Sequence, residues 1–321
     1  MPRASERTSR VPIPRPPRDA HLAHLTSRGA PDGVSRFLTT PEKIAQHLAH
    51  HGLRREDRTM AGHEGDPVEV SVVRPTWHTG HGPALLHLHG GGMIFGSRFD
   101  DIPLVTPWLA RHAMTLVTVE YRLAPQHPDP YPVEDCYAAL EWVRDRAADI
   151  GVDPRRIVLV GASAGAGLAA GVSLLARDRG GPTPLGQMLL YPMLDDRGRT
   201  VSTAQMDDRD GDDAWHAGHN ADAWASLLGE RAGTDRVSPY AAPARASDLS
   251  GLSPTYLDCG SVDVFRDETV AYASALWQAG VAAELHIWAG GTHLHEMHST
   301  SPLAASARQA RSSWLRRLLA D

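Results

Sequence analysis

The residues best suited to chemistry lie in the segment Gly161-Ala-Ser-Ala-Gly165, a G-x-S-x-G pattern between an apolar run and a run of small residues. Between a strand and a helix, this pattern forms a strained turn that exposes the serine hydroxyl above the edge of a sheet. Both flanking positions require glycine, because a Cβ there would collide with the neighbouring strand and helix. The N-terminus of the following helix also favours negative charge near Ser163. The pattern therefore makes Ser163 a candidate nucleophile.

A second glycine-rich segment, His89-Gly-Gly-Gly92, follows the apolar run 84–88. Consecutive glycines let the backbone approach a substrate closely and direct several N–H groups at one point. Together with the amide of Ala164, the amides of Gly91 and Gly92 would form an oxyanion hole for a tetrahedral intermediate.

A nucleophilic serine needs a general base and an acid that orients the base. In the class of folds that uses this serine turn, the acid and then the histidine follow the serine, each on a loop after a late strand. Asp263 follows the strand predicted at 255–258, and His293 follows the strand predicted at 283–288. The alternatives are Asp258 or Asp267 for the acid and His295 or His298 for the base.

Position favours Asp263 among the three acids. Asp258 falls within a predicted strand, and Asp267 begins a predicted helix, where a carboxylate is a favourable N-terminal charge. His293, His295 and His298 all stay open as the base, with His293 preferred because it follows its strand most directly.

The sequence gives weaker support to three other kinds of site. The glycines from 161 to 167 also match the phosphate turn of short-chain dehydrogenases, but three predicted strands precede them, and the only lysine, Lys43, has no tyrosine four residues before it. The cluster 293–298 lacks H-E-x-x-H spacing for zinc. The acidic run 207–213 has its glycine misplaced for a calcium loop. We predict neither a metal nor an organic cofactor.

The elements that must position these residues alternate between strand and helix. Strands are predicted at 68–73, 84–89, 115–121, 157–160, 187–191, 255–258 and 283–288, and helices at 133–149, 164–179, 266–279 and 303–319. Because the strand segments are nearly continuous apolar runs, a mostly parallel sheet covered by helices on both faces is expected. Ligands then bind at the carboxyl ends of the strands.

The first 60 residues and one later insertion depart from the alternation. Residues 1–18, rich in Pro and Arg, are predicted to be a mobile arm, and 19–60 a pair of N-terminal cap helices. Residues 61–321 form the predicted catalytic domain, with an insertion at about 196–240 that contains a helix near 215–228. The cap helices and the insertion are expected to form a lid together.

Composition excludes several classes of protein. The 321 residues have a formal net charge of −6 and 42% apolar side chains, which describes a globular chain without general attraction to nucleic acid or anionic membranes. The uncharged stretch 157–176 contains a β-branched run and four glycines, which favour a buried strand, turn and helix over a membrane span. No secretion signal is visible, so a cytoplasmic location is expected.

These motifs resemble the hormone-sensitive-lipase-like family of α/β-hydrolases, many of them bacterial carboxylesterases. The resemblance covers most of residues 68–300 and rests on His89-Gly-Gly-Gly92, Val119-Glu-Tyr-Arg-Leu-Ala-Pro-Gln-His-Pro128, Asp153-Pro-Arg-Arg156, Gly161-Ala-Ser-Ala-Gly165, Tyr191-Pro-Met-Leu-Asp195 and Asp263-Val-Phe-Arg-Asp-Glu268. In that family the aspartate of the last motif orients the catalytic histidine, which matches Asp263, and a Gly-x-x-His pattern supplies that histidine, which matches His293.

The resemblance implies an α/β-hydrolase fold with a helical cap and a serine carboxylesterase acting on short- to medium-chain acyl esters through an acyl-enzyme. It implies a small-molecule ester as the substrate and no cofactor, and a homodimer is possible. An amidase or another acyl hydrolase with the same three residues is the alternative. Less favoured is a small-molecule receptor on the same fold, because such receptors lose the histidine.

Overall fold

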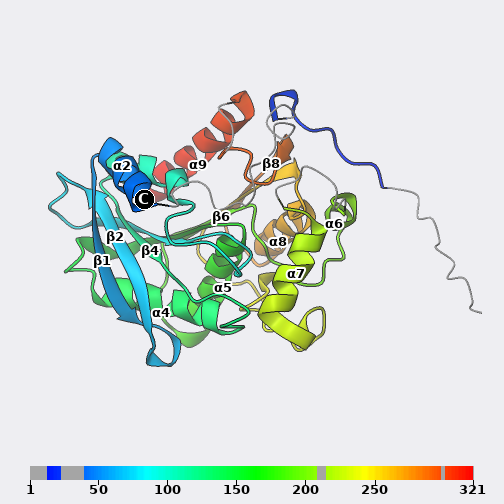
Figure 1. The fold of residues 1–321 in the computed structure, drawn as a ribbon, viewed down its shortest axis with the longest axis horizontal. Helices are drawn as coiled ribbons and strands as arrows, with labels where there is room; N and C mark the ends of the chain where they lie inside the picture. The colour runs from blue at the N-terminus through cyan, green and yellow to red at the C-terminus, as the bar shows by residue number, and fades with distance from the viewer. Residues whose placement is uncertain (1–12, 23–39, 208–214, 298–300, 321) are drawn as a thin grey trace, which may run out of the picture.

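The computed structural model describes residues 13–22, 40–207, 215–297 and 301–320, and these form one eight-stranded sheet (Figure 1). The strand order is β1-β2-β4-β3-β5-β6-β7-β8. β2 is antiparallel to β1 and β4, and all other pairs are parallel. The bounds are β1 Leu53–Ala61, β2 Pro67–Pro75, β3 Gly82–Leu88, β4 Thr115–Val119, β5 Val152–Ala162, β6 Gly186–Leu190, β7 Thr255–Val262 and β8 Ala283–Thr292.

The centre of the sheet is buried on both faces, as the apolar runs predict. Every residue of β3, β4 and β6 is buried, and eight of these seventeen residues are Leu or Val. Strands of this kind need helices over both faces to exclude water.

Six helices form two layers, one on each face of the sheet (Figure 1). One layer contains α4 (Tyr131–Asp145), α5 (Ala164–Arg179) and α8 (Arg266–Gln278), and the other contains α2 (Pro41–His50), α3 (Thr106–His112) and α9 (Pro302–Ala320). In the second layer, Trp108 of α3 donates a hydrogen bond to Ser312 of α9 at 2.8 Å. The other described helical elements are η1 (His63–Gly65), η2 (Ile102–Leu104), α6 (Val201–Gln205), α7 (Ala217–Leu228), η3 (Gly229–Arg231) and η4 (Pro243–Arg245).

The predicted N-terminal cap helices are wrong in one part, because residues 53–61 form strand β1. β1 pairs with β2 along its whole length and lies at the edge of the sheet. Only Leu53 and Met60 of this strand are buried, and five of the residues between them are charged. An edge strand with so few apolar positions shows no alternation from which it could be predicted. α2 matches part of the expected helix pair, and residues 23–39 lie outside the described residues.

The described part of the predicted mobile arm contacts the rest of the chain. Arg15 donates to the carbonyl of Gln205 at the end of α6, and the Gln205 side chain donates to the Pro14 carbonyl. The Asp19 amide donates to the Gly290 carbonyl at 3.0 Å. Residues 13–19 therefore lie between the insertion and the end of β8, whereas residues 1–12 are outside the described residues.

The insertion contains α6 and α7 and lies beside the carboxyl ends of the strands (Figure 1). Two residues before α7, Trp215 packs near Phe95 of the glycine-rich loop, with 6.1 Å between the ring centres. Its action as a lid stays a prediction. In the described parts of the chain, no helix combines the length and apolar character that crossing a membrane would require.

Candidate active site

Ser163 lies in a strained turn between β5 and α5, as the G-x-S-x-G pattern predicts. Its backbone has φ 56° and ψ −119°, a conformation that residues other than glycine seldom adopt. A Cβ on Gly161 would lie 2.3 Å from the backbone of Gly165, and a Cβ on Gly165 would lie 2.0 Å from the Leu88 carbonyl oxygen. The glycines therefore permit the close approach of β3, β5 and α5 that holds the serine in place.

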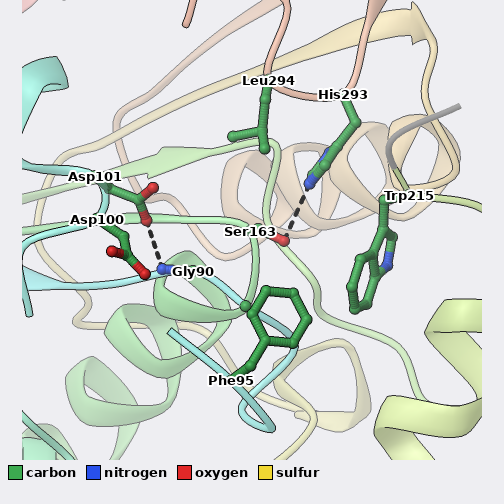
Figure 2. Close-up of a pocket in the computed structure, with 9 residues that line it drawn as sticks. Gly90, Phe95, Asp100, Asp101, Ser163, Trp215, His293 and Leu294 are labelled. Atoms are coloured by element: carbon green, nitrogen blue, oxygen red, sulfur yellow. Dashed lines mark hydrogen bonds between the residues drawn. The ribbon is translucent and has the colours of Figure 1, made fainter. Parts of the chain in front are cut away.

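A chain of two hydrogen bonds joins Asp263, His293 and Ser163 (Figure 2 shows the second). His293 Nε2 lies 3.2 Å from Ser163 Oγ, and His293 Nδ1 lies 2.9 Å from Asp263 Oδ2. The other carboxylate oxygen of Asp263 accepts the Phe265 amide at 3.0 Å. All three side chains are buried. An aspartate that holds one imidazole nitrogen protonated leaves the other free to take the serine proton.

The two alternative acids have other partners. Asp258 accepts two hydrogen bonds from Arg311, at 2.7 and 3.0 Å. Asp267 accepts the Ser202 amide at the start of α6.

Neither alternative base is joined to Ser163 by a described contact. The ring of His295 lies 3.1 Å from the Thr292 carbonyl through Nδ1 and 3.5 Å from Glu296. His298 lies outside the described residues. Of the three histidines, the described hydrogen bonds connect His293 to the serine.

The glycine loop after β3 is anchored through His89. Tyr121 donates its hydroxyl to the His89 carbonyl at 2.7 Å, and the two rings stack with 4.1 Å between their centres. Within the described segments, the backbone amides of Gly91, Gly92 and Ala164 donate no hydrogen bond. Ala164 is the first residue of α5, so its amide belongs to the free donors of a helix N-terminus. These three amides are therefore available to a ligand.

A pocket of about 410 Å³, its mouth included, lies over Ser163 (Figure 2). Phe95, Trp215 and Leu294 form much of its apolar wall. Its complete lining is Gly90, Gly91, Phe95, Asp100, Asp101, Ser163, Trp215, His293 and Leu294.

The sequence analysis did not identify Asp100 and Asp101 as pocket residues. Asp101 accepts the Gly90 amide at 2.5 Å, and burial raises the pKa of its carboxyl to about 7. The signal that could have found them is a pair of adjacent acids eight and nine residues after Gly92, close in sequence to the predicted oxyanion loop.

A buried ionic network lies behind His293 and was also missed. Arg311 of α9 binds Asp258 of β7 through two nitrogens and Glu296 through a third at 2.5 Å. Although burial alone would raise the pKa of Glu296, the charges of Arg311 and His295 lower it to about 2. Glu296 is three residues from His293, so Arg311 ties the histidine loop to the sheet.

Replacing Arg311 by Met is expected to lower the free energy of unfolding by about 3–5 kcal/mol, because two buried carboxylates lose their counter-charge. Urea unfolding measures the change. Arg311→Lys keeps the charge without the planar fork and should lie between Met and the wild type. Arg317→Met, on the exposed side of α9, is the control and should change stability by about 1 kcal/mol or less. Wild-type stability in Arg311→Met would contradict the prediction.

Comparison with known proteins agrees with this geometry. A family model described as alpha/beta hydrolase fold matches residues 85–297. The chain is 34% identical over 268 residues to the carboxylesterase NlhH of Mycobacterium tuberculosis, covering 80% of each chain. It is 31% identical to the ethyl acetate hydrolase of Pseudomonas putida, covering 74% of each. A solved structure of a bacterial heroin esterase matches with a TM-score of 0.84 at 35% identity, covering 94% of this chain and 98% of the other.

The chain therefore belongs to the hormone-sensitive-lipase-like family of α/β-hydrolases, and the resemblance and fold predicted from its motifs are confirmed.

Proposed function

We propose that this chain is a serine carboxylesterase that hydrolyses short- to medium-chain acyl esters through an acyl-enzyme on Ser163. The observation that carries the proposal is the chain of hydrogen bonds from Asp263 through His293 to Ser163 at the edge of a pocket. The carboxylesterases among its relatives support the same reaction class.

Acylation begins when Ser163 Oγ bonds to the ester carbonyl carbon and His293 takes the hydroxyl proton. Asp263 holds the imidazole in the required tautomer and stabilises the imidazolium. The amides of Gly91, Gly92 and Ala164 donate hydrogen bonds to the oxyanion of the tetrahedral intermediate. The C–O bond to the alcohol then breaks, and the alcohol leaves with the proton from His293.

Deacylation repeats these steps with water. His293 takes a proton from the water, whose oxygen bonds to the acyl carbon, and the same amides stabilise the second oxyanion. Cleavage of the bond to Ser163 Oγ releases the carboxylic acid, and His293 returns the proton to the serine. None of these steps calls on a metal or an organic cofactor.

Hydrolysis of p-nitrophenyl esters from acetate to dodecanoate tests this function. We expect kcat/KM to be greatest between acetate and hexanoate and at least about tenfold lower for dodecanoate, because the walls formed by Phe95, Trp215 and Leu294 limit the space for a long chain. p-Nitroacetanilide serves as the matched amide and should react far more slowly.

Two outcomes would change the assignment. Faster cleavage of the anilide than of the acetate ester would favour an amidase. Absence of turnover on every ester, together with tight binding of a small molecule, would favour a receptor. The cytoplasmic location and the possible homodimer stay predictions.

A further inference from the structure

We propose that the pocket at Ser163 selects esters that carry a protonated amine or a quaternary ammonium group in one arm, with Asp100 and Asp101 as the counter-charge. This inference rests on the proposed ester hydrolysis and adds the chemical class of the substrate.

The two carboxylates lie on one side of the nucleophile. Figure 2 shows Asp100 and Asp101 to one side of Ser163, and Trp215 to the other. The two arms of an ester diverge from the carbonyl carbon that the serine attacks. One arm can therefore extend towards the carboxylates while the other lies against the apolar wall at Trp215.

The two acids lack a close cationic partner in the part of the chain that the structure describes. Among the described residues, no Arg, Lys or His forms an ion pair with Asp100 or Asp101. The nearest basic residue along the chain, Arg98, forms ion pairs with Glu69 at 2.9 Å and Glu120 at 2.6 Å instead. Two adjacent acids beside a nucleophile thus attract a cation more strongly than a neutral group of the same shape.

Asp101 has one oxygen left for a ligand. Asp101 is only 7% exposed, and one of its carboxylate oxygens accepts a hydrogen bond from the Gly90 amide. In the described part of the chain, no residue forms a hydrogen bond with the other oxygen. A buried carboxylate without a counter-charge is costly, and a bound ammonium group would remove that cost.

Asp100 is held in place by the turn that precedes it. Its two oxygens accept hydrogen bonds from the Ser97 amide at 3.0 Å and the Ser97 hydroxyl at 3.1 Å. Because these donors are neutral, they orient the carboxylate without neutralising its charge. A charge that is oriented before binding attracts its ligand without a further loss of side-chain freedom.

A different role for Asp101 would be purely structural, because its bond to Gly90 also holds the start of the glycine loop. That role predicts equal losses for charged and uncharged esters. The experiment therefore compares two substrates of the same shape that differ in charge alone.

The first pair is butyrylcholine and 3,3-dimethylbutyl butyrate, in which carbon replaces the ammonium nitrogen. The second pair puts the charge in the acyl arm, with ethyl 4-(trimethylammonio)butyrate and ethyl 5,5-dimethylhexanoate. In at least one pair, the wild type should favour the cation by about tenfold or more in kcat/KM. Asp100→Asn and Asp101→Asn should each lower this ratio towards one, whatever they do to the absolute rates.

Asp145→Asn is the matched control, because it removes one negative charge from an exposed residue at the end of α4. The ratio should be unchanged in this variant. A wild-type ratio of one or less in both pairs would overturn the proposal. So would equal slowing of both esters in Asp100→Asn and Asp101→Asn, which would make the acids structural.

The ratio should also depend on pH. Asp101 faces Asp100, His293 and Glu296, and burial is the main cause that raises its pKa to about 7. The preference for the cation should be stronger above pH 7, where Asp101 is ionised, and weaker below pH 7. The decisive result is a shallower pH dependence of this ratio in Asp101→Asn than in the wild type.

Failure of this inference differs from failure of the proposed function. Hydrolysis of the neutral esters without preference for the cations contradicts the inference alone. A wild type that hydrolyses no ester contradicts both.

Discussion

Ser163→Ala should hydrolyse p-nitrophenyl acetate and butyrate at least about 10⁴-fold more slowly in kcat than the wild type, because no acyl-enzyme can form without Oγ. The residual rate would come from binding and the backbone amides alone. Stopped-flow measurement adds a second criterion, since any burst of p-nitrophenol from acylation should disappear. A serine-reactive phosphonate should label the wild type once and leave the variant unlabelled.

The control is Ser306→Ala on the exposed face of α9, where the hydroxyl donates a hydrogen bond to the Pro302 carbonyl one turn earlier. Its kcat should stay within about twofold of the wild type, as is usual for surface changes. If Ser163→Ala retained wild-type activity or phosphonate labelling, another residue would be the nucleophile and the mechanism proposed for this pocket would be wrong.

Asp263→Asn should lower kcat by about 10³–10⁴-fold with little change in stability. Asparagine has nearly the same shape, but its amide can donate to His293 Nδ1, which leaves Nε2 protonated and unable to accept the serine proton. Steady-state kinetics on the short esters measure the loss, and urea unfolding tests that the fold is kept.

Asp267→Asn provides the matched comparison four residues further along the chain. Asp267 binds the Ser202 amide and Arg266 at the start of α8, away from the imidazole. We expect this variant to stay within about threefold of the wild-type kcat. A large loss in Asp267→Asn combined with near wild-type activity in Asp263→Asn would reverse the assignment of the acid.

Much of the framework could be predicted because its signals are local or periodic. The central strands are continuous apolar runs, and α5 was predicted with the bounds that the structure has, Ala164–Arg179. β1 was missed because an edge strand exposes most of its residues and needs no apolar period. The contact of residues 13–19 with the insertion and β8 was missed because it joins parts of the chain that are distant in sequence.

By itself, the sequence determined the serine turn, the glycine-rich loop and the order of the three candidate catalytic residues. These depend on constraints within a few residues, such as the room that Gly161 and Gly165 leave for neighbouring backbone. The relation of His293, His295 and Asp263 to the serine was decided by tertiary structure, because loops after β5, β7 and β8 meet only when those strands are paired.

Tertiary structure also brought Asp100 and Asp101 to the nucleophile and placed Arg311 behind the histidine loop. In the sequence, an aspartate or an arginine looks the same whether its side chain lies on the surface or in a pocket. Its charge becomes chemically significant only through burial and through the partners that lie within a few ångströms, and distant parts of the chain supply both.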